Sequence, residues 1–479
     1  MHRWRAFVLF LVLGLVVAGC GTGGGGDSRA AGDDDGTGPP PPGDDDNLAD
    51  DDSAADDDST ADDDSVDDDS ADDDSITPEC GMALDTDLVL NQDLDCTAWY
   101  GDSVVFVAAD NVTLDCANHR ISGPGASATN VVYILQQNQV TVRNCEITGG
   151  VVGIAADGSS DIHLLDNVIH QVDGVAIRLN GANVFEIAGN EAYNDGAMQN
   201  GIDMVLSSGG TIADNIVHDF GMGGIQFLGS HDCLLENNLV YNIHDTGFGF
   251  FWDSASGEVT HDIEVTNNEV RDCYSVGANE IMHASHHLTF TGNSFHDVAA
   301  IFFLYQSNGG AMHDIVIEDN QLTDATVAIS IADNTESVAI HGNEITGCAS
   351  TLRVESTQNL VFGRNQIDQA NVRQRKGDAV FAVADSSGVT INHNIVTGGD
   401  ELLFAVASGS PDVDLSENYW NGCPFLDDFL MVDAEVLDVV NPINTLECYE
   451  VDNPYTIVDA DEDGWDDAMC VPPTEVQCI

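Results

Sequence analysis

The chain has 479 residues, and its 83 acidic side chains outnumber the 12 basic ones, which gives a net charge of −71 at pH 7. Because contacts to phosphate groups depend on Lys and Arg, this charge disfavours nucleic acid and anionic membrane surfaces as partners. Anionic polysaccharides are disfavoured in the same way unless divalent cations bridge them. The 12 cysteines fit an oxidising exterior.

Residues 1–19 have the pattern of a signal peptide. The first five residues are partly basic, and the apolar run from Ala6 to Ala18 is too short to span a bilayer. The run ends in Val17-Ala18-Gly19-Cys20, which resembles the processing box of bacterial lipoproteins. The resemblance implies cleavage before Cys20 and attachment of lipid to its sulfur and its new amino group. We therefore expect a lipid-anchored protein of the outer membrane or cell surface, with this lipid as its only membrane contact.

Residues 20–75 have the composition of a disordered tether. They are rich in Gly, Pro and repeated Asp, and they hold 22 Asp against the single basic residue Arg29. Self-repulsion and the lack of apolar side chains predict an extended, solvated segment that separates the folded domain from the membrane. Loose calcium binding by the aspartates is the alternative.

Residues 76–425 contain a repeat marked by asparagine. It returns every 22 to 30 residues, with apolar residues five and three positions before it and another two after it, as in the segment 162–169. Repeats of this length indicate a solenoid whose units bury their apolar sides against each other. The recurring residues are Asn167, Asn190, Asn215, Asn238, Asn268, Asn293, Asn320, Asn343, Asn365, Asn394 and Asn418.

The local pattern predicts which solenoid forms. Alternating apolar residues indicate short strands with one buried face, and Asn tolerates the left-handed conformation of a sharp corner. We therefore predict an all-β, right-handed parallel β-helix of about 13 turns. The asparagines are expected to stack as hydrogen-bonded amides that hold the corner and perform no chemistry. The predicted strand starts are Val112, Val140, Ile162, Phe185, Gly210, Cys233, Ile263, Leu288, Ile315, Val338, Leu360, Val389 and Val413.

The cysteines predict disulfides at the start of the repeats and in the tail. The candidate pairs are Cys80–Cys96, Cys116–Cys145, Cys423–Cys448 and Cys470–Cys478. Cys233 falls at an inward position and is expected to be a buried core residue. Cys273 and Cys348 occupy equivalent positions three turns apart, about 14 Å by the strand spacing, which is too far for a bond.

Three segments resemble a known family. The segments 111–123 and 139–149, with the closing stretch 418–421, resemble bacterial right-handed β-helix proteins of the pectin-lyase-like superfamily, and within it the carbohydrate-binding and sugar-hydrolase repeats. The resemblance covers residues 80–425 and implies the fold and a carbohydrate partner. It leaves the activity open, because the superfamily includes lyases, hydrolases, epimerases, adhesins and inert scaffolds.

The catalytic signatures of that superfamily are largely missing. The Asp-Pro-His-Asp signature of alginate-type epimerases and the spaced aspartates of polygalacturonases are absent, and the only lysine, Lys376, lies in a basic loop. If the protein is an enzyme, we expect an activity of the polysaccharide lyase or glycoside hydrolase type.

One outward face carries the candidate site. In the strand that follows each corner and its loop, residues between buried apolar neighbours must point outward. Equivalent side chains lie about 5 Å apart on adjacent turns and about 10 Å apart across two turns, which suits retaining and inverting glycoside hydrolysis respectively. The candidate catalytic residues are Asp203, Asp253 and Glu280, and the candidate substrate-binding residues are Arg178, Gln226, Trp252 (with Phe251 beside it), His283 and Tyr305. A solvated acidic face with locally packed aromatic side chains is the alternative.

Histidines recur in two further columns. Stacked imidazoles at this rise can bind a transition metal, although hydrogen bonding along the corner explains them as well. The first column is His231, His261, His286 and His313, and the second is His170, His218 and His296, with Tyr193, Tyr241 and Arg271 on the turns between.

Residues 426–479 form a C-terminal tail with a candidate loop for a structural calcium ion. Oxygen ligands at positions 1, 3, 5 and 9, a carbonyl at position 7 and a glycine at position 6 match such loops. The candidate ligands are Asp459, Asp461, Asp463, Trp465 through its carbonyl, and Asp467.

These observations favour a surface lipoprotein whose β-helix binds, and in one version cleaves or modifies, a polysaccharide or cell-surface glycan. Two alternatives stay open. The first is a non-catalytic structural or adhesive stalk, and the second is a periplasmic β-helix that handles metal.

Overall fold

The computed structural model describes residues 78–125, 129–194, 199–306, 310–369, 379–398, 403–408, 410, 413–415, 418–420, 429–432 and 436–437. These residues all belong to one compact unit, residues 74–479. The predicted signal peptide, Cys20 and the predicted tether lie outside the described residues, as do Lys376, the candidate calcium loop and the four cysteines from Cys423 onward.

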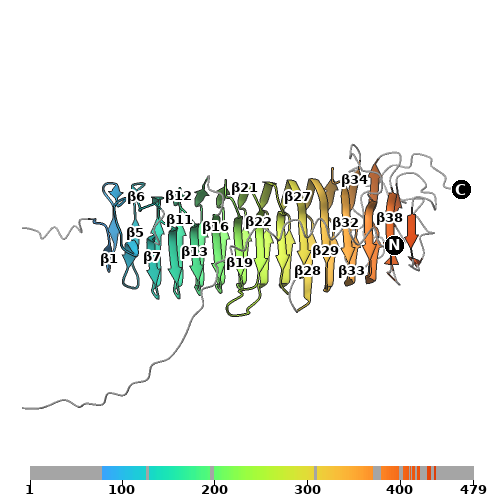
Figure 1. The fold of residues 1–479 in the computed structure, drawn as a ribbon, viewed down its shortest axis with the longest axis horizontal. Coiled ribbons are helices and arrows are strands. Elements are labelled where there is room, and N and C mark those ends of the chain that lie inside the picture. Colours follow the sequence, from blue (N-terminus) through green and yellow to red (C-terminus); the bar gives the residue numbers. More distant parts are fainter. Residues whose placement is uncertain are drawn as a thin grey trace, which may run out of the picture. The chain divides into compact units, whose positions relative to one another are not determined.

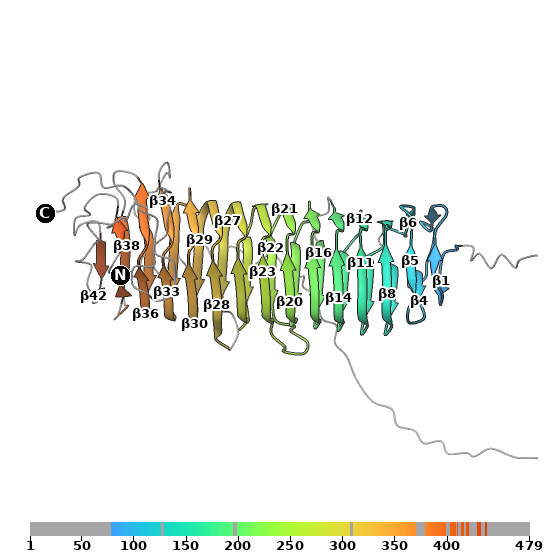
Figure 2. The same ribbon diagram turned by 180° about the vertical axis from the view of Figure 1, so that it is seen from behind.

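The described chain coils into a right-handed parallel β-helix (Figures 1 and 2) in which most turns contribute three strands. In one turn, β11 (Ser160–Leu165) is followed by β12 (Val168–His170) and β13 (Val175–Asn180), and β14 (Asn183–Ala188) then pairs with β11 in parallel. Over the described ranges the chain forms no helix, and so none long and apolar enough to cross a membrane.

Two sheets run along this solenoid. One strand of each turn belongs to a 15-stranded sheet, and the other two belong to a 27-stranded sheet. We call the shorter of these two the corner strands and the longer the face strands. All predicted strand starts but one fall inside the 15-stranded sheet, and Val112 immediately precedes its strand β5. At the two ends, β2 and β42 add one strand each beyond the predicted starts.

The remaining strands of the 15-stranded sheet are β2 (Leu88–Val89), β5 (Thr113–Asp115), β8 (Asn138–Arg143), β17 (Ser208–Ala213), β20 (His231–Glu236), β23 (His261–Thr266), β26 (His286–Thr291), β28 (Met312–Glu318), β30 (Thr335–His341), β33 (Thr357–Gly363), β36 (Ser387–Asn392), β39 (Val413–Asp414) and β42 (Val436–Leu437).

The other corner strands are β3 (Leu94–Asp95), β6 (Arg120–Ser122), β9 (Glu146–Thr148), β15 (Glu191–Tyr193), β18 (Ile216–His218), β21 (Leu239–Ile243), β24 (Glu269–Cys273), β31 (Glu344–Thr346), β34 (Gln366–Gln369), β37 (Ile395–Gly398) and β40 (Tyr419–Trp420). The other face strands are β1 (Met82–Leu84), β4 (Ser103–Val107), β7 (Asn130–Leu135), β10 (Val152–Asp157), β16 (Asn200–Val205), β19 (Gly223–Leu228), β22 (Thr246–Phe251), β25 (Gly277–Met282), β32 (Ser350–Glu355), β35 (Ala379–Ala384), β38 (Leu403–Ser408) and β41 (Phe429–Val432). On two turns the corner and face strands join, as β27 (Ser294–Tyr305) and β29 (Gln321–Ala332).

Apolar side chains fill the interior and stack from turn to turn. Ile162 and Leu164 of β11 are fully buried. Register pairs Ile162 with Val140 on the previous turn and with Phe185 on the next. Burying each such side chain stabilises the fold by roughly 1.5–3 kcal/mol. The period-two alternation in the sequence therefore determines which side chains point inward and which remain available on the surface.

The asparagine column is a continuous ladder of buried amides, as predicted. In one step the backbone N–H of Asn238 donates to Oδ1 of Asn268 at 2.9 Å, and Nδ2 of Asn238 donates to the same oxygen at 3.0 Å. The same Nδ2 also donates to the carbonyl oxygen of Ile212 on the previous turn at 2.9 Å. Because these buried amides bond to one another and to the backbone, the ladder holds the corner.

The left-handed residue at this corner is not the ladder asparagine, which corrects the sequence prediction. The residue immediately before it has positive φ, as in Asp166 (54°), Asn267 (55°) and Arg364 (58°). A ladder asparagine must turn its side chain inward to reach its neighbours. The bend therefore falls on the preceding residue, whose side chain faces away from the ladder.

Two of the predicted disulfides form, Cys80–Cys96 and Cys116–Cys145. Cys233 is a buried free thiol, as predicted. Cys273 and Cys348 are not bonded to each other, as predicted, and both are also buried. Burial raises the pKa of Cys233 to about 11 and the pKa values of Cys273 and Cys348 to about 12. These three thiols therefore stay protonated and serve as small core residues.

Candidate functional site

The outward residues of the face strands line up in one column across the turns. Register pairs Arg178 of β13 with Asp203 of β16, and Asp203 with Gln226 of β19, so these three lie on successive turns as predicted. The next three turns contribute Gly249, Glu280 and Phe303. We call the following six positions the face column: Arg178, Asp203, Gln226, Gly249, Glu280 and Phe303.

An aromatic ring covers the glycine of the face column. A Cβ added to Gly249 would overlap the ring of Phe251, so the ring lies directly over this backbone. Phe251 ends β22 and is partly exposed. The face column therefore presents an aromatic surface between Gln226 and Glu280, and it does so because a glycine leaves room for the ring.

Asp203 is a buried carboxyl in the face column. Only 8% of this residue is exposed, although the neighbours on either side of it fill the core. Nδ2 of Asn200 donates to Oδ2 of Asp203 at 3.2 Å, while the buried Oδ1 has no hydrogen-bond partner among the described residues. Burial raises the pKa of Asp203 to about 6, against the opposing effects of the Asn200 hydrogen bond and the charge of Arg178. An unpaired buried oxygen is costly, and a ligand hydroxyl that reaches Oδ1 removes that cost.

Glu280 is a partly buried carboxyl two turns beyond Gln226. Burial, and secondarily the negative charge of Asp245, raise the pKa of Glu280 to about 7. Asp245 lies just before β22, and its carbonyl oxygen accepts from the backbone N–H of Gly277 at the start of β25. A carboxyl with this pKa is partly protonated near neutral pH, so it can either donate or accept a proton. Sequence reasoning missed Asp245, because only the register between turns places this loop residue near Glu280.

The three predicted catalytic carboxyls are not brought together. Asp203 and Glu280 are three turns apart in register, about 14 Å at the strand spacing. This separation exceeds the roughly 5–9.5 Å found between the paired carboxyls of glycoside hydrolases. Asp253 lies in the loop after β22, where its Oδ2 accepts from the backbone N–H of Ser256 at 2.7 Å. Asp245 and Glu280 are instead the pair whose charges interact.

Two of the predicted substrate-binding residues stack on each other just beyond the face strands. The ring centroids of Trp252 and His283 lie 5.3 Å apart, with 23° between the ring planes. Burial lowers the pKa of His283, and its buried Nδ1 has no hydrogen-bond partner in the described part of the chain. Tyr305 ends β27 and stacks on Phe303 at 6.0 Å. The aromatic surface thus continues past Glu280 to the next turn.

The column of outward residues extends further toward the N-terminus than predicted. Tyr133 of β7 and Ala155 of β10 precede Arg178 in register. The Tyr133 hydroxyl donates to Oδ2 of Asp157 at 2.9 Å, and burial together with this hydrogen bond raises the pKa of Tyr133. The ring of Phe106, one turn earlier, lies 5.9 Å from that of Tyr133. Alternation within β7 was the signal that could have found Tyr133.

Both predicted histidine columns form stacks. The first stacks with ring centroids 4.7–5.0 Å apart through His231, His261, His286 and His313. The second stacks at 4.7–5.1 Å through His170, Tyr193, His218 and Tyr241 and is continued in register by Arg271 and His296. Glutamates beside the second column contact its histidines, for example Glu146 at 3.3 Å from Nε2 of His170. The histidines of the second column therefore have carboxylate neighbours on the corner strands.

Comparison with solved structures gives the same architecture. A tailspike protein of E. coli bacteriophage HK620, solved in complex with a pentasaccharide, is 13% identical, with 74% of this chain and 73% of that chain covered and a TM-score of 0.50. A lacto-N-biosidase from Eubacterium ramulus is 13% identical over 61% of this chain and 59% of its own, with a TM-score of 0.40. The A-module of an Azotobacter vinelandii mannuronan C-5 epimerase is 14% identical over 71% and 92%, with a TM-score of 0.37. At these identities the likeness shows the fold alone.

The sequence itself matches a family model for the right-handed β-helix region, over residues 152–312 and 281–419. These segments cover more than half of the chain. No curated protein matches it. The matched residues span the face column, the asparagine ladder and the stacked histidines described above. The chain therefore belongs to the right-handed β-helix family, and its architecture is that of the pectin-lyase-like proteins.

Proposed function

We propose that this chain binds a polysaccharide along the face column. The observation that carries the proposal is the partly exposed Phe251 ring over Gly249. Gly249 lies between Gln226 and Glu280 in register, so the ring lies between an amide and a carboxyl on adjacent turns. An aromatic face packs against the apolar side of a sugar ring, while amide and carboxyl groups bond its hydroxyls. Turns about 4.8 Å apart repeat these contacts along an extended chain.

The charge of the protein limits the kind of polysaccharide. With Asp203 and Glu280 in the column and a net charge of −71, an uncharged glycan meets less repulsion than an anionic one. The HK620 tailspike, whose structure holds a pentasaccharide, is an example of this fold with a bound sugar. That likeness supports the fold, and the proposal depends on the side chains of the face column.

A glycan array probed with the full chain tests the proposal. Phe251→Ala removes the stacking surface and is expected to weaken binding by about tenfold or more, equivalent to about 1.4 kcal/mol. Tyr100→Ala is the matched control, because it removes an aromatic residue that is 94% exposed near the N-terminal end of the solenoid. The control should bind like the wild type. Equal binding by Phe251→Ala would overturn the face column as the binding site. No glycan bound by the wild type would instead favour the structural or adhesive stalk.

Glycoside hydrolysis is a second candidate function, favoured by the carboxyl pair Asp245 and Glu280. Glu280, with its raised pKa, would protonate the leaving oxygen, and Asp245 would activate water. On a glycan that the array identifies, the release of reducing ends is measured alongside binding. Glu280→Gln should keep binding this glycan and should no longer release reducing ends from it. The wild-type rate should fall as the pH rises above about 7, because Glu280 then loses its proton. Binding without any release of reducing ends by the wild type would reject hydrolysis and leave the binding proposal intact.

The setting of this domain is also proposed from the sequence. Lipid on Cys20 would anchor the chain at the outer membrane or cell surface, and the acidic tether of residues 20–75 would hold the β-helix away from the membrane. A calcium ion bound through Asp459, Asp461, Asp463 and Asp467 would order the tail.

A further inference from the structure

The first histidine column is built from a repeated pair of residues. On β20, β23 and β28 a histidine is followed by an aspartate, as His231-Asp232, His261-Asp262 and His313-Asp314. In each pair the aspartate Oδ2 lies 2.7–2.8 Å from Nδ1 of its own histidine. On β26, between β23 and β28, the pair is His286-His287, so the position of the aspartate is taken by a second imidazole.

His287 is the second residue of β26, at the corner between the face strand β25 and the 15-stranded sheet, and its backbone is left-handed. Its φ is 52°, close to the 54°, 52° and 55° of Asp232, Asp262 and Asp314. Histidine is among the residues that adopt this conformation more often than most. The corner therefore directs the His287 ring to the place where the neighbouring turns put a carboxylate, next to the ring of its own column.

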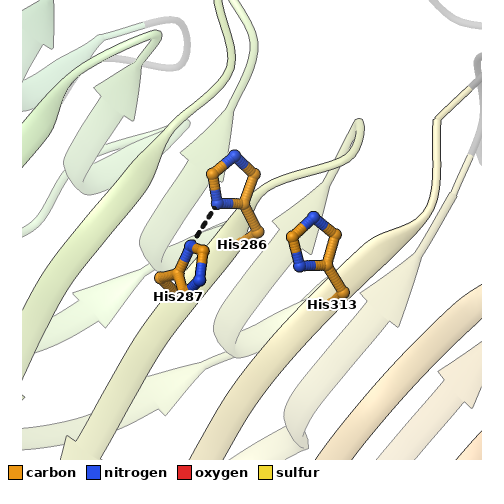
Figure 3. A group of neighbouring side chains, drawn as sticks. All are labelled: His286, His287 and His313. Atoms are coloured by element: carbon orange, nitrogen blue, oxygen red, sulfur yellow. Dashed lines mark hydrogen bonds between the residues drawn. The ribbon is translucent and has the colours of Figure 1, made fainter.

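Three imidazoles converge at this corner (Figure 3). Nδ1 of His286 and Nδ1 of His287 lie 2.7 Å apart, so at most one of these two nitrogens can carry a proton there. The rings of His286 and His313 are stacked at 4.7 Å, and the ring of His287 meets both of them edge-on. One nitrogen from each ring lies within 4.8 Å of the other two.

The surroundings favour a cation. Asp262 and Asp314 flank His287, with carboxylate oxygens 4.0 Å from its Nδ1 and 3.5 Å from its Nε2 respectively. Burial, and secondarily the neighbouring imidazoles, lower the pKa of His286. Neutral imidazoles bind zinc, copper and nickel ions in preference to calcium or magnesium ions.

We propose that His286, His287 and His313 form a binding site for a divalent transition-metal ion such as Zn²⁺. The ion replaces the proton shared by His286 and His287, and the two flanking carboxylates offset its charge. Bonds of about 2.0–2.1 Å to three nitrogens place those nitrogens roughly 3.3 Å apart. His287 and His313 reach this geometry by small side-chain rotations, for which their exposed fractions of 50% and 37% leave room.

A matched pair of substitutions on the full chain tests the site. His287→Asn removes one ligand and keeps a residue that tolerates the left-handed backbone. Asp232→Asn makes a similar exchange at the same corner on the β20 turn, away from the three histidines. Zn²⁺ is titrated against a competing chelator in excess Ca²⁺, which is added to compete for the acidic tether and the candidate calcium loop.

The wild type and Asp232→Asn are expected to bind one more Zn²⁺ than His287→Asn, or to bind it at least about tenfold more tightly. His313→Gln should reproduce the loss, with unchanged circular dichroism in each variant. The affinity should also fall as the pH is lowered, because protons compete with the metal ion for the imidazoles. Zn²⁺ uptake by His287→Asn equal to that of the wild type, or no uptake by the wild type in excess Ca²⁺, would overturn the proposal and leave the column as a hydrogen-bonded corner.

Discussion

At the scale of single residues, Asp203 combines burial with a missing hydrogen-bond partner. Its pKa of about 6 in the folded state lies above the 3.8 of an unperturbed Asp. The folded state therefore holds the proton more tightly than the unfolded chain. The stability that this provides is complete below pH 3.8 and is lost as the pH rises through 6, an effect of about 3 kcal/mol.

Asp203→Asn removes this pH dependence while keeping the shape of the side chain. The variant is expected to be more stable than the wild type at pH 7.5 by roughly 1–3 kcal/mol, and the difference should vanish near pH 4. Urea unfolding at several pH values measures it. Asp253→Asn is the control, because bonds to Ser256 lower the pKa of Asp253 instead. A constant difference between Asp203→Asn and the wild type across the pH range would show that folding does not shift the pKa of Asp203.

At the scale of the element, two adjacent asparagines at the corner after β23 have different roles. Asn268 is buried in the ladder, and its Nδ2 donates to Leu235, Thr266 and Asn293 at 2.8–3.0 Å. Asn267 is exposed and takes the left-handed backbone with φ 55°. Sequence spacing identified the ladder but assigned the left-handed bend to the wrong one of the two.

Substitution by glycine is expected to affect the free energy of unfolding very differently at the two positions. Asn268→Gly leaves several buried donors and acceptors unpaired, each at a cost of about 1–3 kcal/mol, so a loss of about 4 kcal/mol or more is expected. Asn267→Gly should change the free energy of unfolding by less than about 1 kcal/mol, because glycine adopts positive φ without strain. Chemical unfolding of both variants checks this. Comparable losses at the two positions would mean that the buried amide of Asn268 contributes no more to the corner than the exposed side chain of Asn267.

The face strands show how far the sequence predicts the site. Alternation placed Arg178, Asp203, Gln226 and Glu280 outward, because core packing leaves one choice of face per strand. It could not place Phe251, whose ring reaches back over Gly249. The contact between turns that brings Asp245 near Glu280 also depends on register across loops of unequal length, which no local pattern records.

At the scale of the whole molecule, the parallel stacking of turns lets one binding site draw side chains from several consecutive turns. The face column and the first histidine column lie on different sheets, the 27-stranded and the 15-stranded one, so glycan and metal ligands can be held on separate sides of the same turns. Because the turns repeat one backbone conformation, equivalent positions form rows along the solenoid. His287 stands where neighbouring turns have an aspartate, so one residue changes the chemistry of its row.

The proposed attachment of the chain to a membrane is tested at Cys20. A single lipidated residue would carry all membrane affinity, because the tether that follows is strongly acidic and is repelled by anionic lipid. Cys20→Ser should therefore move the protein from the membrane fraction to the soluble fraction and abolish incorporation of labelled fatty acid. A deletion of residues 33–74 should stay with the membrane, since it shortens the tether and keeps the lipid. If Cys20→Ser remained membrane-bound, the anchor would have to lie in the uncleaved apolar segment before it.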